Sequence, residues 1–243
     1  MNAKPQADPF FIYQVELSSH CNMKCSYCPH PTMQREQGYM SEEVLGACIQ
    51  RFKSQGGSVL VLHHFGEPLL HPRLANRLRQ VADAGLAMQL SSNTLLLDRS
   101  FDTLVSIPAP ITVMVSVHRW VNKDEQEYFA AVDAWKQRAE GTNLTIVHAY
   151  NLRAGKYTLH RWTNGASSRW DPRLCPFVKE NLAVVLWNGD IANCCCDHEG
   201  FTVKQNILDA DCDSHLSTVW RSCRTCDVGR LMVGETWRPA NHK

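Results

Sequence analysis

The chain has 243 residues, of which 44% are hydrophobic and 20% charged, and its formal net charge is +1. This composition is that of a folded globular protein, and the length fits one large domain or one domain with a small appendage. A net charge so close to zero gives no electrostatic reason to expect nucleic acid or an anionic membrane as a partner. No apolar run approaches the roughly 18 residues that a transmembrane helix needs, so we expect no membrane span.

The cysteine content predicts metal ligation in a reducing compartment. No apolar signal sequence accompanies the 11 cysteines, so we expect a cytoplasmic protein whose thiols bind metal rather than form disulfides. Three cysteines fall in one early motif, and positions 49–174 contain none. The last third holds Cys175, Cys194, Cys195, Cys196, Cys212, Cys223 and Cys226. This distribution predicts two separate metal sites.

Strands alternate with helices after a leader, residues 1–10, that we expect to be flexible. The predicted strands span 11–17, 58–65, 87–91, 111–117 and 144–149. The predicted helices span 42–54, 73–84, 99–106 and 125–139, and Ser41 is a good N-cap for the first of them. This alternation predicts an α/β fold with parallel strands, and five such units suit a partial barrel rather than a closed eightfold one.

The first cysteine motif follows the first predicted strand with the spacing C-x3-C-x2-C, formed by Cys21, Cys25 and Cys28. Three thiolates in one short loop can hold three corners of a cubane iron–sulfur cluster and leave its fourth iron open. An open coordination position is where a metal site does chemistry. A zinc loop or three unrelated thiols are the alternatives, although zinc sites generally use cysteine pairs in two halves.

This motif resembles the signature of the radical SAM superfamily, in which an aromatic residue, here Tyr27, precedes the last cysteine. In that superfamily the open iron chelates S-adenosylmethionine (SAM). One electron from the cluster then cleaves SAM to methionine and a 5′-deoxyadenosyl radical, which abstracts a substrate hydrogen. The resemblance implies a catalytic role for the three cysteines, a SAM-binding 4Fe-4S cluster, and a one-electron donor such as flavodoxin or ferredoxin.

Polar residues stand at the ends of the predicted strands, where ligands bind in parallel α/β proteins. Gly66 and Glu67 follow the second strand, and the resemblance implies that they meet the amino group of the bound methionine. Here Phe65 replaces the first glycine of the superfamily's G-G-E element. The other candidates for contact with SAM are Ser91, Asn93, Ser116 and His118. For each of these, a polar residue that merely ends a strand is the alternative.

The second group of cysteines surrounds a predicted β-hairpin at residues 183–193, with a tight turn at Asn188-Gly189. A helix is predicted near 216–220. Four thiolates placed around these elements could fill every iron of an auxiliary 4Fe-4S cluster, and a four-cysteine zinc site is the alternative. The predicted ligand set is Cys175, Cys194, Cys223 and Cys226. Because side chains alternate along a strand, we expect Cys195 to point away from Cys194, which leaves Cys196 as the substitute ligand.

This tail resembles the SPASM/twitch extension of radical SAM enzymes in its one-cluster form. Nearly the whole chain resembles the 2-deoxy-scyllo-inosamine dehydrogenase type in sequence. The segments that show the resemblance are VELSSHCNMKCSYCP, HFGEPLL and ENLAVV. The implied organisation is a radical SAM core at 11–155, a connecting, substrate-facing segment at 156–174, and a hairpin-plus-helix extension at 175–243. Arg153 and Asn164 are the candidates for substrate binding.

Three functions remain open from the sequence. The first is a dehydrogenase-like radical SAM oxidoreductase that passes an electron from its substrate, such as an aminocyclitol or sugar alcohol, to the auxiliary cluster. The second is a radical SAM enzyme that crosslinks or epimerises a ribosomal peptide, and in an epimerase a spare thiol could return a hydrogen atom. The third is a zinc-stabilised interaction module without chemistry.

Overall fold

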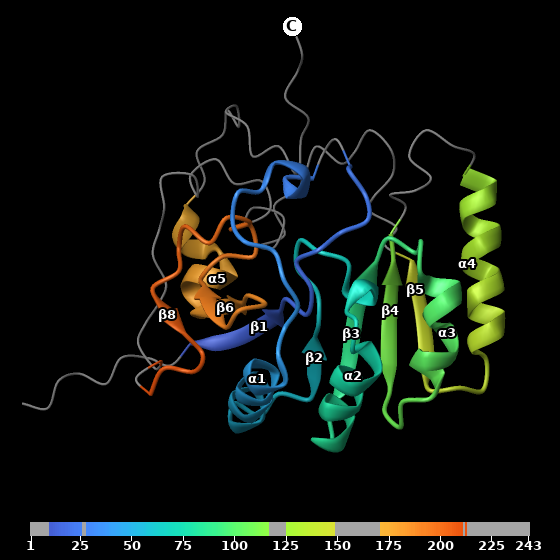
Figure 1. Cartoon of the computed structure of the whole chain (residues 1–243), viewed down its shortest axis with the longest axis horizontal. Coiled ribbons are helices and arrows are strands. Elements are labelled where there is room, and N and C mark those ends of the chain that lie inside the picture. The colour runs from blue at the N-terminus through green and yellow to red at the C-terminus, as the bar shows by residue number, and fades with distance from the viewer. Residues whose placement is uncertain (1–9, 26–27, 117–124, 149–170, 211, 213–243) are drawn as a thin grey trace, which may run out of the picture.

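The structure is a computed structural model, and it describes residues 10–25, 28–116, 125–148, 171–210 and 212. Within these ranges the expected α/β architecture is confirmed as two four-stranded sheets with accompanying helices (Figure 1). The helix expected near 216–220 lies outside the described residues. So do six residues singled out in the sequence, namely Tyr27, His118, Arg153, Asn164, Cys223 and Cys226.

One sheet is entirely parallel and has the strand order β2-β3-β4-β5. Its strands are β2 (Val59–Val61), β3 (Ala87–Ser92), β4 (Ile111–Val115) and β5 (Leu144–His148). The connecting helices are α1 (Glu42–Ser54), α2 (Leu74–Asp83), α3 (Leu97–Val105) and α4 (Glu125–Ala139). Ser41 begins α1 as expected, because its hydroxyl oxygen accepts a hydrogen bond from the Val44 N–H at 3.1 Å.

The other sheet is mixed and has the order β1-β6-β7-β8. Its strands are β1 (Phe11–Val15), β6 (Leu182–Val185), β7 (Asp190–Ala192) and β8 (Gln205–Asn206). The pair β6–β7 is the expected hairpin, and β6 also runs parallel to β1. The first strand of the core therefore forms its hydrogen-bonded ladder with the tail hairpin rather than with β2. The short helices are η1 (His30–Thr32), η2 (Pro68–Leu70), η5 (Pro172–Leu174) and α5 (Pro176–Lys179).

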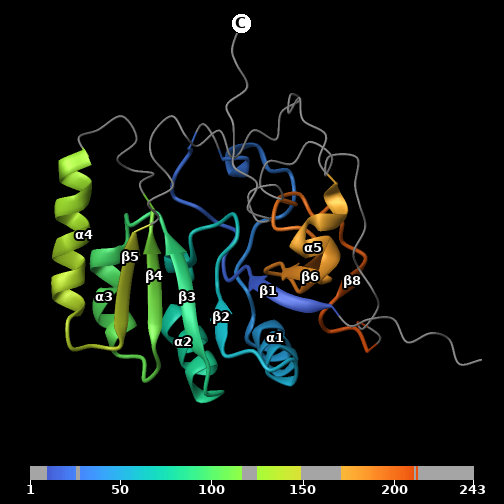
Figure 2. The ribbon, with the colours of Figure 1, turned by 180° about the vertical axis from the view of Figure 1, so that it is seen from behind.

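The two sheets stand side by side. Both views place the elements in the lateral order β5, β4, β3, β2, β1, β6 (Figures 1 and 2). Where β1 faces β2, the Gln14 side-chain amide hydrogen-bonds to His64 Nδ1 at 2.7 Å, and the Glu67 N–H donates to the His20 carbonyl at 2.8 Å. These bonds join the strands of the two sheets into one open, barrel-like arrangement.

Strand β2 is shorter than the predicted strand at 58–65. Its ladder ends at Val61, and one further backbone bond runs from the Leu62 N–H to the Gln89 carbonyl. Beyond it the chain turns toward β1, where His64 contacts Gln14 of that strand and Gly66 contacts Ser18 and Ser19 after it. The apolar run at 58–65 predicts a longer strand because the local pattern does not reveal these contacts, which come from a distant part of the sequence.

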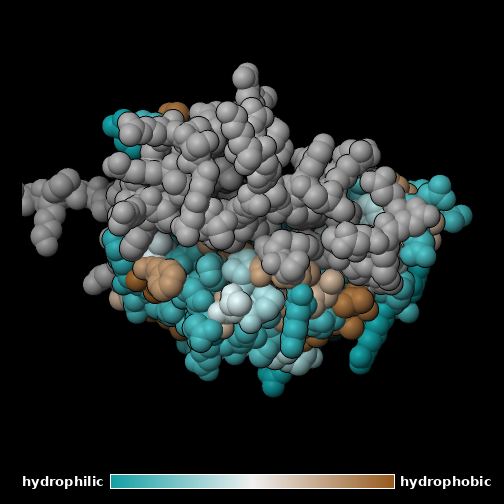
Figure 3. Space-filling model, turned by 90° about the horizontal axis from the view of Figure 1, so that it is seen from above, coloured by the Kyte–Doolittle hydropathy of each residue, from teal (hydrophilic) through white to brown (hydrophobic). Residues whose placement is uncertain are grey.

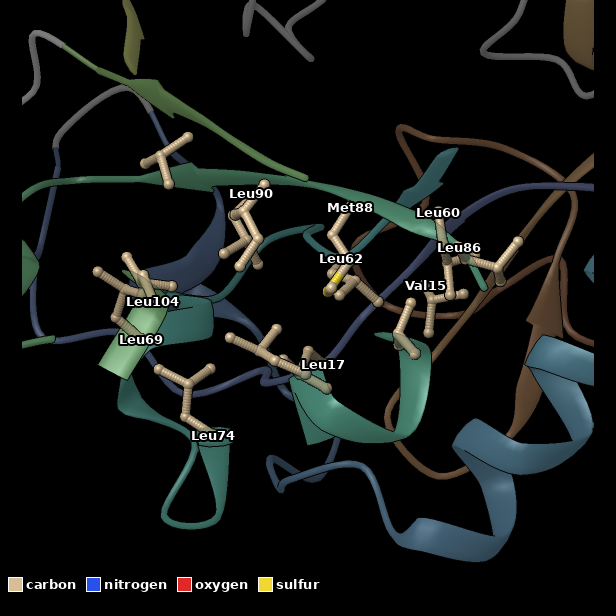
Figure 4. Packing of buried hydrophobic residues seen from close by; sticks show 14 of the residues in the cluster. Val15, Leu17, Leu60, Leu62, Leu69, Leu74, Leu86, Met88, Leu90 and Leu104 are labelled. Carbon is tan, nitrogen blue, oxygen red and sulfur yellow. The ribbon is translucent and has the colours of Figure 1, made fainter. Parts of the chain in front are cut away.

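The hydrophobic core lies between the strands and the helices. Figure 4 shows Val15 and Leu17 from the first strand and the segment after it, packed close to Leu60 and Leu62. Leu17, Leu60 and Leu62 have no exposed surface. Because burial of one such side chain contributes about 1.5–3 kcal/mol, this contact contributes to holding β1 against β2.

The coloured surface in the view from above is mainly hydrophilic, with separate hydrophobic spots (Figure 3). Isolated exposed apolar residues of this kind are normal on folded proteins. Among the described residues, no helix combines the length and the apolar character that crossing a bilayer requires.

Candidate active site

A cavity of about 150 Å³ lies where the chain leaves strands β1 to β4. Figure 1 shows the segment after β1 running above the arrowhead ends of the parallel strands. The lining residues are Cys21, Met23, Cys25, Cys28, His30, His64, Phe65, Gly66, Glu67, Ser91, Ser92, Asn93 and Ser116. The cavity therefore lies at the edge of the sheet at which ligands bind in parallel α/β proteins.

Eight residues proposed from the sequence line this one cavity, namely Cys21, Cys25, Cys28, Gly66, Glu67, Ser91, Asn93 and Ser116. The sequence reasoning missed His64 as a lining residue, although a polar residue near the end of a buried apolar strand was an available signal. Met23 in the cysteine loop and His30 at the start of η1 were missed as well, and neither position carried such a signal.

The loop that carries the three cysteines is held by its own backbone and by both of its flanks. The Cys28 N–H donates to the Cys25 carbonyl at 3.1 Å. Before the loop, Ser19 is bound to Gly38 through its backbone and its hydroxyl. After it, His30 Nε2 lies 2.8 Å from the Ser19 carbonyl oxygen. These bonds hold the two ends of the loop together.

The thiols of the loop are half-buried, and no described cysteine forms a disulfide. Burial raises the pKa of Cys28 to about 11 and also raises the pKa of Cys21. Without a metal these thiols are neutral, and metal binding would release their protons. Among the described residues, no three Cys, His, Asp or Glu side chains converge on a single metal position.

Gly66 brings the loop after β2 into contact with the backbone that follows β1. A Cβ atom at this position would stand 1.9 Å from the Ser18 carbonyl oxygen and 2.8 Å from the Ser19 Cα. Only glycine permits this approach, because backbone atoms at such distances cannot be displaced cheaply. The contact forms the floor of the cavity beside the cysteine loop.

We expect Gly66→Ala to separate these two loops and weaken SAM binding about five- to a hundredfold, since overpacking of this kind costs about 1–3 kcal/mol. Equilibrium dialysis with labelled SAM measures the effect. Gly46→Ala in α1 is the matched control, because the nearest atom to its new methyl group would be the flexible end of Gln80, at 3.3 Å. Equal SAM affinity in the two variants would contradict the close-packing argument.

Glu67 is buried beneath the cavity, and its two carboxylate oxygens join neighbouring loops. One oxygen accepts from the Leu69 N–H at 3.0 Å, and the other accepts from the Asn93 N–H at 2.7 Å. Burial raises the pKa of Glu67 from its ordinary 4.5 to about 7, although these hydrogen bonds oppose the shift. The carboxyl group therefore ties the end of β3 to the loop after β2.

Because the folded-state pKa of Glu67 lies above that of the unfolded chain, its contribution to the free energy of unfolding falls as pH rises from 4.5 toward about 7. The fall amounts to roughly 3 kcal/mol for a shift of this size. We expect Glu67→Gln to remove this part of the pH dependence, as measured by denaturation midpoints across that range. The substitution also changes the overall free energy of unfolding, because one backbone N–H loses its acceptor. The quantity to compare is therefore the slope of the free energy of unfolding against pH. An unchanged slope would contradict the raised pKa.

Three cysteines of the second group, Cys194, Cys195 and Cys196, lie in a turn after β7. The prediction that Cys195 points away from Cys194 along a strand is wrong, because the strand ends at Ala192. The Cys195 and Cys196 sulfurs lie 3.8 Å apart, and the Cys196 N–H donates to the Cys194 sulfur. Hydrogen bonds from the Cys195 and Cys196 thiols lower the pKa of Cys194 to about 3. The turn thus gathers three sulfurs, with Cys194 the most easily ionised.

Cys175 and Cys195 pack against the same small apolar cluster, which is made of Phe177, Val184, Leu186 and Ala192. The structure thereby brings the segment before β6 and the turn after β7 to one patch of the mixed sheet. This agrees with a shared site for the cysteines on both sides of the hairpin. Cys195 therefore lies on the same side of the hairpin as the other cysteines of the turn.

A buried ion pair joins the segment after the cysteine loop to the tail. The Arg35 guanidinium pairs with the Glu16 carboxylate, whose side chain is entirely buried. Arg35 also donates from Nε to the His198 carbonyl and from its backbone N–H to Glu199. Trp187 adds a bond from its indole N–H to the Glu36 carbonyl at 3.1 Å. The turn that carries Cys194 is therefore docked against the segment that follows the first cysteine loop.

Comparison with known proteins agrees with this geometry. The family model of the radical SAM superfamily matches residues 15–144, more than half of the chain. The chain belongs to the radical SAM superfamily. Membership implies SAM and a 4Fe-4S cluster as cofactors, and it confirms the family proposed from the first cysteine motif.

Individual relatives cover different shares of this radical SAM protein. The tungsten-containing aldehyde ferredoxin oxidoreductase cofactor-modifying protein of Pyrococcus furiosus is 30% identical over 99 residues. That match spans 40% of this chain and only 28% of the relative. The structure of BtrN in complex with AdoMet and 2-DOIA is similar with a TM-score of 0.59 and 20% identity, over 94% of this chain and 87% of BtrN. SuiB of Streptococcus suis bound to S-adenosylmethionine has a TM-score of 0.50 and 12% identity, over 85% and 62% of the two chains. At these identities the structural likeness shows the fold.

The residues of the cavity fit the cofactors that membership implies. Three thiols lie at one side, and the Gly66 loop and the polar ends of β3 and β4 lie around them. The thiols could hold a cluster. Within the part of the chain that the structure describes, the buried hydroxyl oxygen of Ser116 has no hydrogen-bond partner, so it is available to a polar ligand. The cavity thus combines metal ligands with hydrogen-bonding groups for an organic cofactor.

Proposed function

We propose that this protein is a radical SAM oxidoreductase that removes two electrons from a small polar substrate, such as an aminocyclitol or a sugar alcohol. It cleaves SAM reductively, and one electron from the substrate passes to an auxiliary 4Fe-4S cluster. The observation that carries the proposal is the strand pairing of β1 with β6, because it builds both groups of cysteines on one sheet. A common sheet fixes the two cysteine sites relative to each other, which favours electron transfer between them.

In the first site, Cys21, Cys25 and Cys28 would hold three irons of the SAM-binding cluster. When bound, this cluster supplies the electron that releases the 5′-deoxyadenosyl radical from SAM. Gly66 permits the close loop contact, and Glu67 holds the loop in place for the methionine end of SAM. Ser91 and Ser116 stand at the strand ends as partners for the rest of the cofactor. The protein's own contribution is position and exclusion of water.

In the second site, we propose Cys175 and Cys194 as ligands on either side of the hairpin, with Cys223 and Cys226 completing the set. The depressed pKa of Cys194 supports its choice, since the thiolate is the form that binds metal. The extension proposed at 175–243 would then hold a fully ligated cluster that does not bind SAM. Its place in the reaction is to accept the electron that the substrate radical releases along with a proton.

A peptide-modifying radical SAM enzyme is the second candidate. The specific observation in its favour is the cluster of three sulfurs at Cys194–Cys196, because a four-ligand site leaves some of them unused. A spare thiol beside the active site could return a hydrogen atom to a substrate radical, as an epimerase requires.

Product analysis separates the two candidates. The full chain would be reconstituted anaerobically with iron and sulfide, reduced, and supplied with SAM and either aminocyclitols or candidate peptides. The proposal predicts 5′-deoxyadenosine together with a product lighter than its substrate by two hydrogens. A modified peptide, either inverted at unchanged mass or crosslinked with the loss of two hydrogens, and no turnover of aminocyclitols would replace it with the second candidate.

A further inference from the structure

Asn93, directly after β3, is held in one orientation by backbone groups. Its backbone N–H donates to Glu67, and its side-chain oxygen accepts from the Leu95 N–H at 3.1 Å. Only 6% of the residue is exposed. Because a backbone N–H can only donate, the atom that receives it must be the amide oxygen, so the assignment of the two amide atoms is settled by chemistry.

The amide nitrogen of Asn93 therefore points at the first cysteine loop. It donates to the Asn22 side-chain oxygen at 2.8 Å and lies 3.8 Å from the Cys21 sulfur, within hydrogen-bonding range of a thiolate. Asn22 and Cys21 are adjacent, so the bond to Asn22 keeps the donor beside the sulfur. A buried and fully oriented donor thus faces one of the thiols that line the cavity.

We propose that the Asn93 amide N–H donates to the Cys21 thiolate and thereby raises the reduction potential of the SAM-binding cluster. The inference rests on the proposed function, in which Cys21 holds that cluster. Reduction adds one electron and increases the negative charge on the ligand sulfurs. A fixed donor stabilises that added charge, and hydrogen bonds to the sulfurs are among the factors that set the potential of such clusters.

This role differs from the contact between Asn93 and SAM that the sequence predicts. The side-chain oxygen of Asn93 is occupied by Leu95, and its nitrogen is directed to the cysteine loop, so the side chain faces the cluster position. Asn93 is then a positioning and tuning residue, and its effect is present before SAM binds. A potential measured in the absence of SAM separates the two roles.

The test is an EPR-monitored redox titration of the anaerobically reconstituted full chain without SAM. The signal that changes on later addition of SAM identifies the first cluster. Asn93→Asp keeps the acceptor for Leu95 but replaces the donor with a negative oxygen. Asn93→Ala removes both the donor and the acceptor for the Leu95 N–H, without adding a charge. Ser106→Ala, whose exposed hydroxyl donates to the Thr103 carbonyl after α3 and does not line the cavity, is the control.

We expect the midpoint potential to become more negative in Asn93→Ala, to become more negative still in Asn93→Asp, and to stay unchanged in Ser106→Ala. Equal potentials in all four proteins would overturn the inference. So would failure of both folded Asn93 variants to assemble the cluster, because the amide would then serve assembly rather than tuning. If the unmodified chain assembles no SAM-sensitive cluster, the proposed function itself fails, and the inference fails with it.

Discussion

Alanine in place of Cys21, Cys25 or Cys28 is expected to abolish the formation of 5′-deoxyadenosine from SAM. Each thiol lines the same cavity, and a cluster that loses one of its three protein ligands is no longer held. With two four-iron sites, the iron content should fall by about half while the second site stays loaded. Chromatographic detection of 5′-deoxyadenosine and iron analysis of the reconstituted variants measure both effects.

Cys212→Ala is the matched control for these substitutions. Its half-buried thiol contacts Arg51 and the Ile207 carbonyl, away from the lining of the cavity. We expect this variant to retain its iron and to cleave SAM. Retained 5′-deoxyadenosine formation in any one of the three loop variants would refute the assignment of the first site.

Arg35→Ala is expected to lower the free energy of unfolding by about 3–5 kcal/mol, because it leaves the Glu16 carboxylate buried without its partner. Lys136→Ala is the comparison, since its ion pair with Asp133 is exposed and contributes less than about 1 kcal/mol. Urea denaturation followed by tryptophan fluorescence measures both variants.

A double variant shows whether the unpaired charge is the cause. Glu16→Gln combined with Arg35→Ala removes the buried charge, so part of the lost stability should return. A loss in Arg35→Ala no larger than that in Lys136→Ala would contradict the role of this pair in docking the tail onto the core.

Local signals in the sequence were sufficient for much of the fold. The helix predicted at 42–54 forms with those bounds, because its N-cap and acidic first turn are encoded in adjacent residues. The helix at 125–139 also forms as predicted. The cysteine loop and the Gly66-Glu67 element line one cavity because consecutive parallel strands bring their carboxyl ends to the same edge.

Long-range pairing could not be predicted in this way. Strand β1 pairs with β6, whose residues lie about 170 positions later, and nothing local to either strand specifies that partner. The bonds from Arg35 to Glu16 and Glu199 are also not specified by any local pattern. Glu16, a single carboxylate within the apolar run 11–17, was nevertheless a usable sign that a buried partner exists. The sequence analysis expected strand-like alternation at Cys194 and Cys195, where the structure has a turn. The hairpin pattern alone does not define the residue at which the second strand of the hairpin ends.

The central claim is that one electron passes between two iron–sulfur sites, and the most direct measurement is made on a chain in which Cys21, Cys25 and Cys28 are all alanine. Metal analysis and EPR of this variant, reconstituted anaerobically, report only on the tail. We predict four irons per chain, no zinc, and the spectrum of a reducible 4Fe-4S cluster that is unaffected by SAM. One zinc ion and no iron would contradict the account, because the proposed dehydrogenase would then have no electron acceptor.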